Sequence, residues 1–352
     1  MIRSHTWRLL ALLATGCLLA LPGTAAAEHV QCGDVIAQDT TLDGDLVCAG
    51  NALEVVANGV TLDLGGHTIR QSGAAGRGVV AYSGNHVEIR NGTIRGFADG
   101  VHTDGARGTA LRDMVLEHNG NGLRCAYAPE CRIEDSTIRD NGVGIQVASA
   151  DGGSREPTVV RRSRIHDNGV GLSVTGERAV VTENRIERNQ TDGIRNDYGY
   201  PVDIVRNVVS RNGGDGVEIW YLADATVAKN RIFDNGANGV AVFGSFGQFG
   251  DTAADVRDNR ITGNDRDGVL VRDPGIVATV ERNHTDRNGD DGIEVDHGPT
   301  SDLCCFDVVV SANRAFFNAD LGIEAVPAAT DGGGNRAKHN GDPAQCVGVS
   351  CR

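Results

Sequence analysis

The chain is poor in several residue types, and each shortage excludes something. Aromatic residues make up only 4% of its 352 residues, so a large core must be built from aliphatic side chains. After residue 27, no stretch shows the 3.6-residue apolar periodicity of an amphipathic helix, which argues against helical and α/β folds. No apolar run after that point is long enough to cross a bilayer, so we expect no membrane span.

Metal ligands and positive charge are also scarce. Two Met and ten scattered His, none at ligand spacing, argue against copper binding, and the absence of a CxxC pair argues against a metal cluster. The net charge is −14, and removing the two arginines of the leader, Arg3 and Arg8, changes it to −16. Such an acidic chain does not bind nucleic acid or anionic membranes by bulk electrostatics.

Residues 1–27 have the features of a secretory signal peptide. Two arginines precede an apolar run from Leu9 to Leu21, and Ala25-Ala26-Ala27 forms a small-residue cleavage site before Glu28. A lipoprotein cut at Cys17 is the alternative, but the apolar run continues past it, which favours simple secretion. We therefore expect a secreted or periplasmic protein.

Eight cysteines remain after the leader, and an even number in an exported chain indicates disulfides. Cys32 and Cys48 are expected to link the start of the first coil, and Cys125 and Cys131 to close a short loop. The remaining four are expected to join the C-terminal tail to the last coil, by pairing Cys304 and Cys305 with Cys346 and Cys351.

The main positive signal is a Gly followed by an aliphatic residue, which returns about every 22 residues. The pairs begin at Gly78, Gly100, Gly122, Gly144, Gly171, Gly193, Gly216, Gly239, Gly268, Gly292 and Gly322. A period of this length indicates stacked units that bury their apolar faces only against their neighbours. We expect Gly193 and Gly216 to be required because of a positive φ.

Each unit contains three short alternating runs joined by Asn, Gly or Asp, which predicts three strands per coil. Asn recurs once per coil in two columns, and we interpret both as structural turn ladders in which Asn adopts the left-handed conformation. One column is Asn91, Asp113, Asp135, Asn184, Asn207, Asn230, Asn259, Asn283 and Asn313. The other is Asn119, Asn141, Asn168, Asn189, Asn212, Asn235, Asn264, Asn288 and Asn318.

These residues resemble the right-handed parallel β-helix repeat proteins of the pectate-lyase-like superfamily, over about residues 75–325. The resemblance implies an all-β, single-stranded right-handed parallel β-helix solenoid of about eleven coils, capped at both ends. It is unspecific for chemistry, because that superfamily includes lyases, glycoside hydrolases, epimerases, adhesins and unreactive scaffolds. The expected divisions are a signal peptide at 1–27, a cap and first coil at 28–75, repeats at 76–327 and a disulfide-linked tail at 328–352.

Side chains that alternate with the buried aliphatics should form outward columns on this fold. Between residues 195 and 297 these columns are charged and aromatic, which predicts a polysaccharide-binding groove. The candidate substrate-binding residues are Arg195, Tyr198, Tyr200, Trp220, Tyr221 and Phe243, and Phe246 and Phe249 lie in an insertion nearby. The candidate catalytic residues are Asp197, Glu218, Arg272, Asp296 and His297, with Asp197 and Glu218 as the nearest carboxylate pair.

Family motifs for catalysis are only approached. Arg155-Glu-Pro157 nearly matches a pectate lyase motif, and Asp273-Pro274 nearly matches an alginate epimerase motif, but each lacks a required residue. Acidic turns at Asp286–Asp291 and Asp251–Asp258 make Ca²⁺ a candidate cofactor. Three hypotheses follow: a monomer that binds, and in one version cleaves or epimerises, an acidic extracellular polysaccharide; a non-catalytic envelope scaffold; and a periplasmic metal-handling protein.

Overall fold

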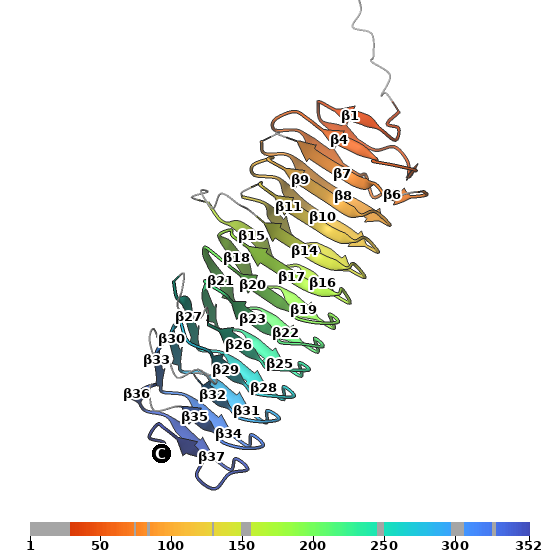
Figure 1. The fold of residues 1–352 in the computed structure, drawn as a ribbon. Helices are drawn as coiled ribbons and strands as arrows, with labels where there is room; N and C mark the ends of the chain where they lie inside the picture. Colours follow the sequence, from red (N-terminus) through yellow and green to blue (C-terminus); the bar gives the residue numbers. More distant parts are fainter. Residues whose placement is uncertain are drawn as a thin grey trace, which may run out of the picture.

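The computed structural model describes residues 29–73, 75–82, 85–128, 130–148, 156–244, 250–296, 306–325 and 329–352. These residues form an elongated stack of coils that runs from the N-terminal to the C-terminal end (Figure 1). Every regular element among them is a strand, and every pairing between strands is parallel. None of the described segments is a helix of the length and apolarity that a membrane crossing needs.

The first wall of the stack is a sheet of fourteen strands among the described residues. Eleven of them, β7 to β35, carry the eleven Gly-aliphatic pairs, so the predicted register is confirmed. The strands are β1 (Asp34–Ile36), β4 (Leu53–Val55), β7 (Arg77–Tyr82), β9 (Asp99–Asp104), β11 (Asn121–Ala126), β14 (Val143–Ala148), β17 (Val170–Thr175), β20 (Ile194–Asp197), β23 (Val217–Trp220), β26 (Val240–Phe243), β29 (Val269–Arg272), β32 (Ile293–Asp296), β35 (Ile323–Ala325) and β38 (Cys346–Val347).

The second wall follows the first along each coil. Its strands are β2 (Thr40–Thr41), β5 (Thr61–Asp63), β12 (Arg132–Glu134), β15 (Thr158–Arg161), β18 (Ala179–Thr182), β21 (Pro201–Val205), β24 (Asp224–Ala228), β27 (Thr252–Arg257), β30 (Ile276–Glu281), β33 (Phe306–Ser311) and β36 (Thr330–Gly333). Two longer strands, β8 (Glu88–Arg95) and β10 (Ala110–Glu117), contribute to both the second and the third wall.

The third wall closes each coil before the chain returns to the first. Its remaining strands are β3 (Leu46–Cys48), β6 (Thr68–Gln71), β13 (Thr137–Arg139), β16 (Arg164–His166), β19 (Arg185–Glu187), β22 (Val208–Ser210), β25 (Arg231–Phe233), β28 (Arg260–Thr262), β31 (His284–Asp286), β34 (Arg314–Phe316) and β37 (Arg336–Lys338). The prediction of three strands per coil is therefore confirmed.

Aliphatic side chains fill the interior of the stack. Ile194 on β20 lies between Leu172 and Val217 of the neighbouring coils, and all three are fully buried. Each such side chain contributes roughly 1.5–3 kcal/mol through burial. Small aliphatics suffice because each coil encloses only a narrow core, which explains the low aromatic content.

The glycines of the repeat are required for a different reason from the expected one. Gly193 and Gly216 are not among the glycines with positive φ. Instead, a β-carbon at Gly193 would lie 2.7 Å from the carbonyl oxygen of Gly216 and 2.8 Å from the Nδ2 of Asn212. A side chain here would push neighbouring coils apart, so glycine permits the close stacking of the first wall.

The Asn ladders are present, with one correction. The left-handed residue is the one before the ladder Asn: Arg188 and Arg211 have φ of 54° and 56°, and they precede Asn189 and Asn212. The amide of Asn189 donates to Oδ1 of Asn212 in the next coil at 2.9 Å. This Asn is buried and bridges coils, while its neighbour makes the bend.

The assignment of Asn91, Asp113 and Asp135 to the first Asn column is wrong. All three have positive φ, of 59°, 52° and 51°, so they occupy the bend position. The ladder position one residue later holds Gly92, Met114 and Ser136 in these coils. Ser136 and Ser163 continue the ladder with hydroxyl groups until Asn184 begins the run of amides.

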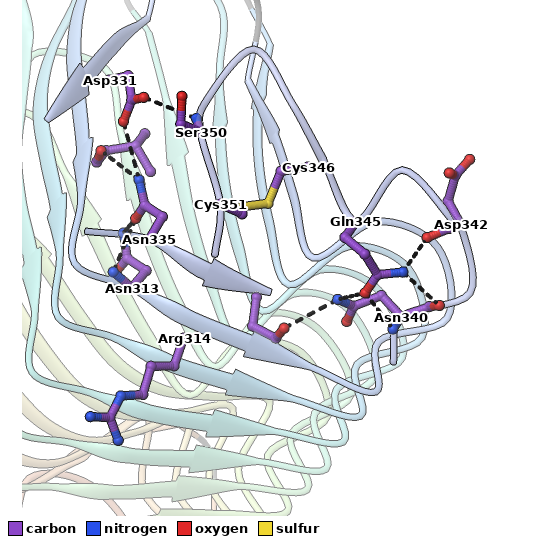
Figure 2. Close-up of a disulfide and its surroundings, with 12 residues drawn as sticks. Asn313, Arg314, Asp331, Asn335, Asn340, Asp342, Gln345, Cys346, Ser350 and Cys351 are labelled. Carbon is purple, nitrogen blue, oxygen red and sulfur yellow. Dashed lines mark hydrogen bonds between the residues drawn. A yellow bond between two sulfur atoms is a disulfide. The ribbon is translucent and has the colours of Figure 1, made fainter. Parts of the chain in front are cut away.

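Disulfides close both ends of the described chain and one corner. The expected bonds Cys32–Cys48 and Cys125–Cys131 are present. The expected pairing of Cys346 and Cys351 with Cys304 and Cys305 is wrong, because Cys346 and Cys351 bond to each other (Figure 2). Cys304 and Cys305 lie outside the described residues. The two cysteines are five positions apart in the sequence, so their disulfide closes a short terminal loop.

Candidate functional site

The expected outward columns are vertically aligned on the first wall. Asp197 of β20 pairs in register with Trp220 of β23, and Trp220 pairs with Phe243 of β26. Arg272 of β29 and Asp296 of β32 continue the same column. Because side chains alternate along each strand, Trp220 and Glu218 project from the same face of one strand.

The first charged cluster surrounds Arg195. Its guanidinium donates to Glu218 at 2.7 Å and to Asp192 at 2.5 Å, so it joins two coils. Burial, reinforced by the charge of Asp192, raises the pKa of Glu218. Burial also raises the pKa of Asp197, whose Oδ1 is buried without a hydrogen-bond partner. Glu218 is thus held by Arg195, whereas one carboxyl oxygen of Asp197 is buried and accepts no hydrogen bond from the described residues.

Aromatic side chains lie beside this cluster, where β20 and β23 end. Trp220 is 50% exposed and Tyr198 is 53% exposed, and Tyr200 is also exposed. The rings of Tyr198 and Tyr221 stack with centroids 6.2 Å apart, and Trp220 lies 6.3 Å from Tyr221. We call Tyr198, Tyr200, Trp220 and Tyr221 the aromatic cluster.

A positive φ places two of these rings. Tyr198 and Tyr221 have φ of 59° and 47°, a conformation that costs a non-glycine residue free energy. The same bend occurs at Tyr127, at the end of β11. Each ring is thereby carried out of the strand and onto the outer edge of the first wall.

The second charged cluster lies farther along the stack. Arg272 donates to Glu294 at 2.8 Å and lies 3.4 Å from a carboxylate oxygen of Asp296. Three coils separate Arg272 from Asp197, which is roughly 14 Å at about 4.8 Å per coil. The candidate catalytic residues therefore form two separate groups, and His297, Phe246 and Phe249 lie outside the described residues.

Between the two clusters, the side chains of the outward column that contains Glu218 are buried. Ala241 and Leu270 stand in the outward column after Glu218, yet they are 0% and 3% exposed. Three cavities among the described residues lie elsewhere, and none of these three is lined by Trp220, Glu218 or Arg272. On the described part of the first wall, the aligned columns thus give an exposed aromatic ridge with charged neighbours.

A third ladder escaped the reading of the sequence. From β20 to β32, the Asp or Asn immediately before the Gly-aliphatic pair is buried, and its side chain accepts the backbone N–H of the residue at the same position one coil later. The members from β20 onward are Asp192, Asp215, Asn238, Asp267 and Asp291, with Leu321 as the final donor. The sequence signal for this ladder is an Asp-Gly or Asn-Gly pair at a fixed phase of the repeat.

This ladder holds carboxyl groups in an environment that disfavours their charge. Burial is the main cause that raises the pKa of Asp267 to about 7 and that of Asp291 to about 8. Nearby carboxylates, including Glu294 for Asp267, act in the same direction. One further inward residue was missed: Asn196 lies in the core column between Val174 and Ile219, and its Nδ2 has no hydrogen-bond partner.

The described residues do not fit a copper site. Copper in proteins is bound by His, Cys and Met. The six described cysteines are all in disulfides, and Met114 is buried in the core. The one group of three ligand side chains found within the described ranges is Asp290, Asp291 and Asp320, whose oxygens lie within 4.8 Å of one another.

The acidic turns considered for Ca²⁺ differ from each other. In the turn after β27, Asp258 pairs with Arg282 at 2.8 Å and Asp255 with Arg257 at 2.5 Å. In the other turn, Asp291 accepts the N–H of Leu321 at 2.7 Å. Ca²⁺ binding stays a prediction.

Comparisons with known proteins agree with this architecture. A family model described as periplasmic copper-binding protein (NosD) matches residues 39–208 and 83–248. A search of curated proteins finds no match. The structure resembles the Dettilon tailspike protein (gp208), at 15% identity and a TM-score of 0.57, over 88% of this chain and 61% of that one. This chain therefore spans less than two thirds of that tailspike.

Two mutants of the periplasmic alginate epimerase AlgG are also similar. One is 16% identical with a TM-score of 0.52, over 90% of this chain and 78% of that chain. The other is 15% identical with a TM-score of 0.53, over 90% and 76%. These likenesses confirm the right-handed parallel β-helix fold. The family match and the disulfides place the chain as a secreted or periplasmic protein.

Proposed function

This chain belongs to the family described as periplasmic copper-binding protein (NosD), and within that exported β-helix frame we propose that it binds an extracellular polysaccharide at the aromatic cluster. The observation that carries this proposal is the half-exposed indole of Trp220, which stands among tyrosines and ionised groups. Aromatic faces stack on the apolar faces of sugars, while Arg and carboxylate groups hydrogen-bond their hydroxyls. Tyr198 and Arg195 supply these two kinds of contact beside Trp220.

Copper handling is not the function that these residues support. The family description names copper, but the described part of this chain offers acids and no set of His, Cys or Met side chains near one another. Acidic oxygens are the ligands of harder cations. We therefore attribute to this member the fold and compartment of the family and a different ligand.

The experiment is a glycan array with the mature chain, followed by calorimetry of the best ligand. We expect Trp220→Ala to weaken binding about tenfold or more, which corresponds to the loss of about 1.4 kcal/mol of stacking. Tyr127→Ala is the matched control, because Tyr127 is 59% exposed and follows the first-wall strand β11 at the position equivalent to Tyr198. Equal affinities for the two variants, or an array without any ligand, would reject the proposal.

A catalytic step on the bound polysaccharide would depend on Asp197. Its carboxyl has a raised pKa and an unpartnered oxygen, which suits a general acid, and Glu218 lies on the adjacent coil. A uronide-release assay tests this step directly. Release by the wild type and its loss in Asp197→Asn, with binding retained, is the expected result if the chain cleaves its ligand.

The second candidate is a non-catalytic envelope scaffold. It is favoured by the burial of Ala241 and Leu270 and by the ion pairing of Arg195 and Arg272, since these features close much of the first wall. A scaffold needs rigidity and no exposed ligand site. An array without a ligand, in a chain that melts cooperatively and resists proteolysis, would favour it.

A further inference from the structure

A row of basic residues runs along the third wall of this acidic protein. The first residue of each third-wall strand from β25 to β37 is Arg231, Arg260, His284, Arg314 or Arg336, and the five are directly in register. Their side chains point outward, and the four arginines are exposed. We call these five residues the arginine ladder.

The ladder arginines lack acidic partners, unlike others in the same column. Arg164 and Arg185 stand at the same position on β16 and β19, and both pair with the buried Glu187, at 2.8 and 2.6 Å. Among the described residues no ion pair involves Arg231, Arg260, Arg314 or Arg336. Figure 2 shows the guanidinium of Arg314 without an interaction to the other residues drawn.

The surroundings leave this positive charge uncompensated. In the neighbouring outward column the acid is Asp286, which pairs with Arg287 at 2.6 Å. Asp258, two residues before Arg260 in the chain, pairs with Arg282. Like charges stacked about 4.8 Å apart repel one another, so an anion that lies across them would gain from all of them.

His284 reports on this positive field. Its pKa is lowered by burial and by the charges of Arg260 and Arg314, which lie directly before and after it in the ladder. A hollow of about 270 Å³ opens at this point, lined by Arg282, Asn283, His284, Ala312 and Arg314. The hollow gives an anionic group a place to approach the ladder.

Aromatic rings accompany the cations. The guanidinium of Arg231 lies 4.6 Å from the centre of the Phe233 ring. The ring of Phe316 meets the imidazole of His284 edge-on at 5.8 Å. Such a surface fits a sugar that carries acidic groups, because the aromatic rings can stack on the sugar ring and the cations can bind the acidic groups.

We propose that the arginine ladder binds a linear anionic polysaccharide that lies along the axis of the stack. One basic residue per coil over five coils, four of them arginines, gives a row roughly 19 Å long, at about 4.8 Å per step. A single file of charges matches a single polymer chain better than a broad membrane surface. The ladder is on the third wall, and the aromatic cluster is on the first, so this site stands independently of the proposed function.

The test is the binding of alginate, a linear polyuronate, to the full chain at several salt concentrations. Arg231→Gln, Arg260→Gln and Arg314→Gln combined should weaken binding at least tenfold at low salt. They should also reduce the slope of log Kd against log salt by about two to three units. Each contact releases about one counterion on binding, so each lost contact removes about one unit of slope. These side chains are exposed and form no ion pair with the described residues, so the melting temperature should change little.

The matched control is Arg164→Gln, which removes the same charge from the same column at a position that Glu187 already neutralises. It should leave both the affinity for alginate and the salt slope unchanged. Equal binding by the triple variant and the control would overturn the proposal. Tighter ladder-dependent binding of single-stranded DNA or of phosphatidylglycerol vesicles than of alginate would also overturn it, in favour of those ligands.

Discussion

Single residues in the third ladder show how a coil position can hold a carboxyl group or an amide. Asn238 stands between Asp215 and Asp267 and is buried like them. Its Nδ2 donates to Oδ1 of Asp215 at 3.0 Å, and its Oδ1 accepts the N–H of Asp267 at 3.1 Å. An amide therefore satisfies the position without a charge, whereas a carboxyl group there places a charge in a buried site whenever it ionises.

Asp267→Asn should make the stability of the chain less sensitive to a rise in pH from about 4 to about 7. The pKa of Asp267 is raised to about 7, so the folded state keeps this proton while the unfolded chain has lost it. Wild-type stability is consequently greatest at low pH and falls as the pH rises through about 7. In urea unfolding between pH 5 and pH 9, the variant should gain about 1–3 kcal/mol relative to the wild type.

Asp265→Asn is the control for this prediction, since Asp265 is exposed two residues away. It removes the same formal charge without removing a buried one. A stability difference between Asp267→Asn and the wild type that does not change with pH would contradict the account of the ladder.

At the scale of strands and turns, the positions of the first-wall strands from β7 to β35 were predictable, because the close approach of successive coils requires a small residue at one fixed position in each repeat. The period of the Gly-aliphatic pairs gave the register of the first wall, since only glycine permits the approach of the next coil. The same reasoning assigned residues 28–75 to a cap and one coil, whereas two coils, β1 to β6, lie there, because their sequences lack the Gly-aliphatic pair. It also misplaced Asn91, since Asn serves both the bend and the ladder position, and the spacing alone does not distinguish them.

The C-terminal end shows how a ladder is terminated. Asn340 extends the second Asn column by one coil beyond Asn318. Both its backbone N–H and its Nδ2 donate to Oε1 of Gln345 at 3.0 Å (Figure 2). The Gln side chain thus replaces the Asn of a further coil. Capping of this kind keeps the open end of a solenoid from exposing unpaired groups.

Gln345→Ala should loosen the last coil. It leaves two donors of the buried Asn340 without their acceptor, which costs roughly 1–3 kcal/mol. Hydrogen exchange should show faster exchange of the amides in β37, with β20 unaffected. Lys338→Ala, on an exposed residue of β37, is the control, and equal protection in the two variants would contradict the capping role.

For the whole molecule, the fold was more predictable than the site. Spacing identified which side chains stack, so Trp220, Glu218 and Asp197 were correctly placed on one wall. Spacing did not reveal that Ala241 and Leu270 are covered or that Arg195 and Arg272 are tied up in ion pairs, because these depend on neighbouring side chains. The arginine ladder was overlooked although Arg follows the Asn at Asn230-Arg231, Asn259-Arg260 and Asn313-Arg314.

The most direct measurement is the fluorescence of Trp220 during titration with the polysaccharide found on the array. The chain has two tryptophans, and the other, Trp7, lies in the expected signal peptide, so the mature protein reports on Trp220 alone. We predict that saturating ligand shifts the emission to shorter wavelength and protects the indole from acrylamide quenching. Unchanged emission and quenching, while calorimetry records saturable binding, would show that the ligand does not contact Trp220 and would contradict the central claim.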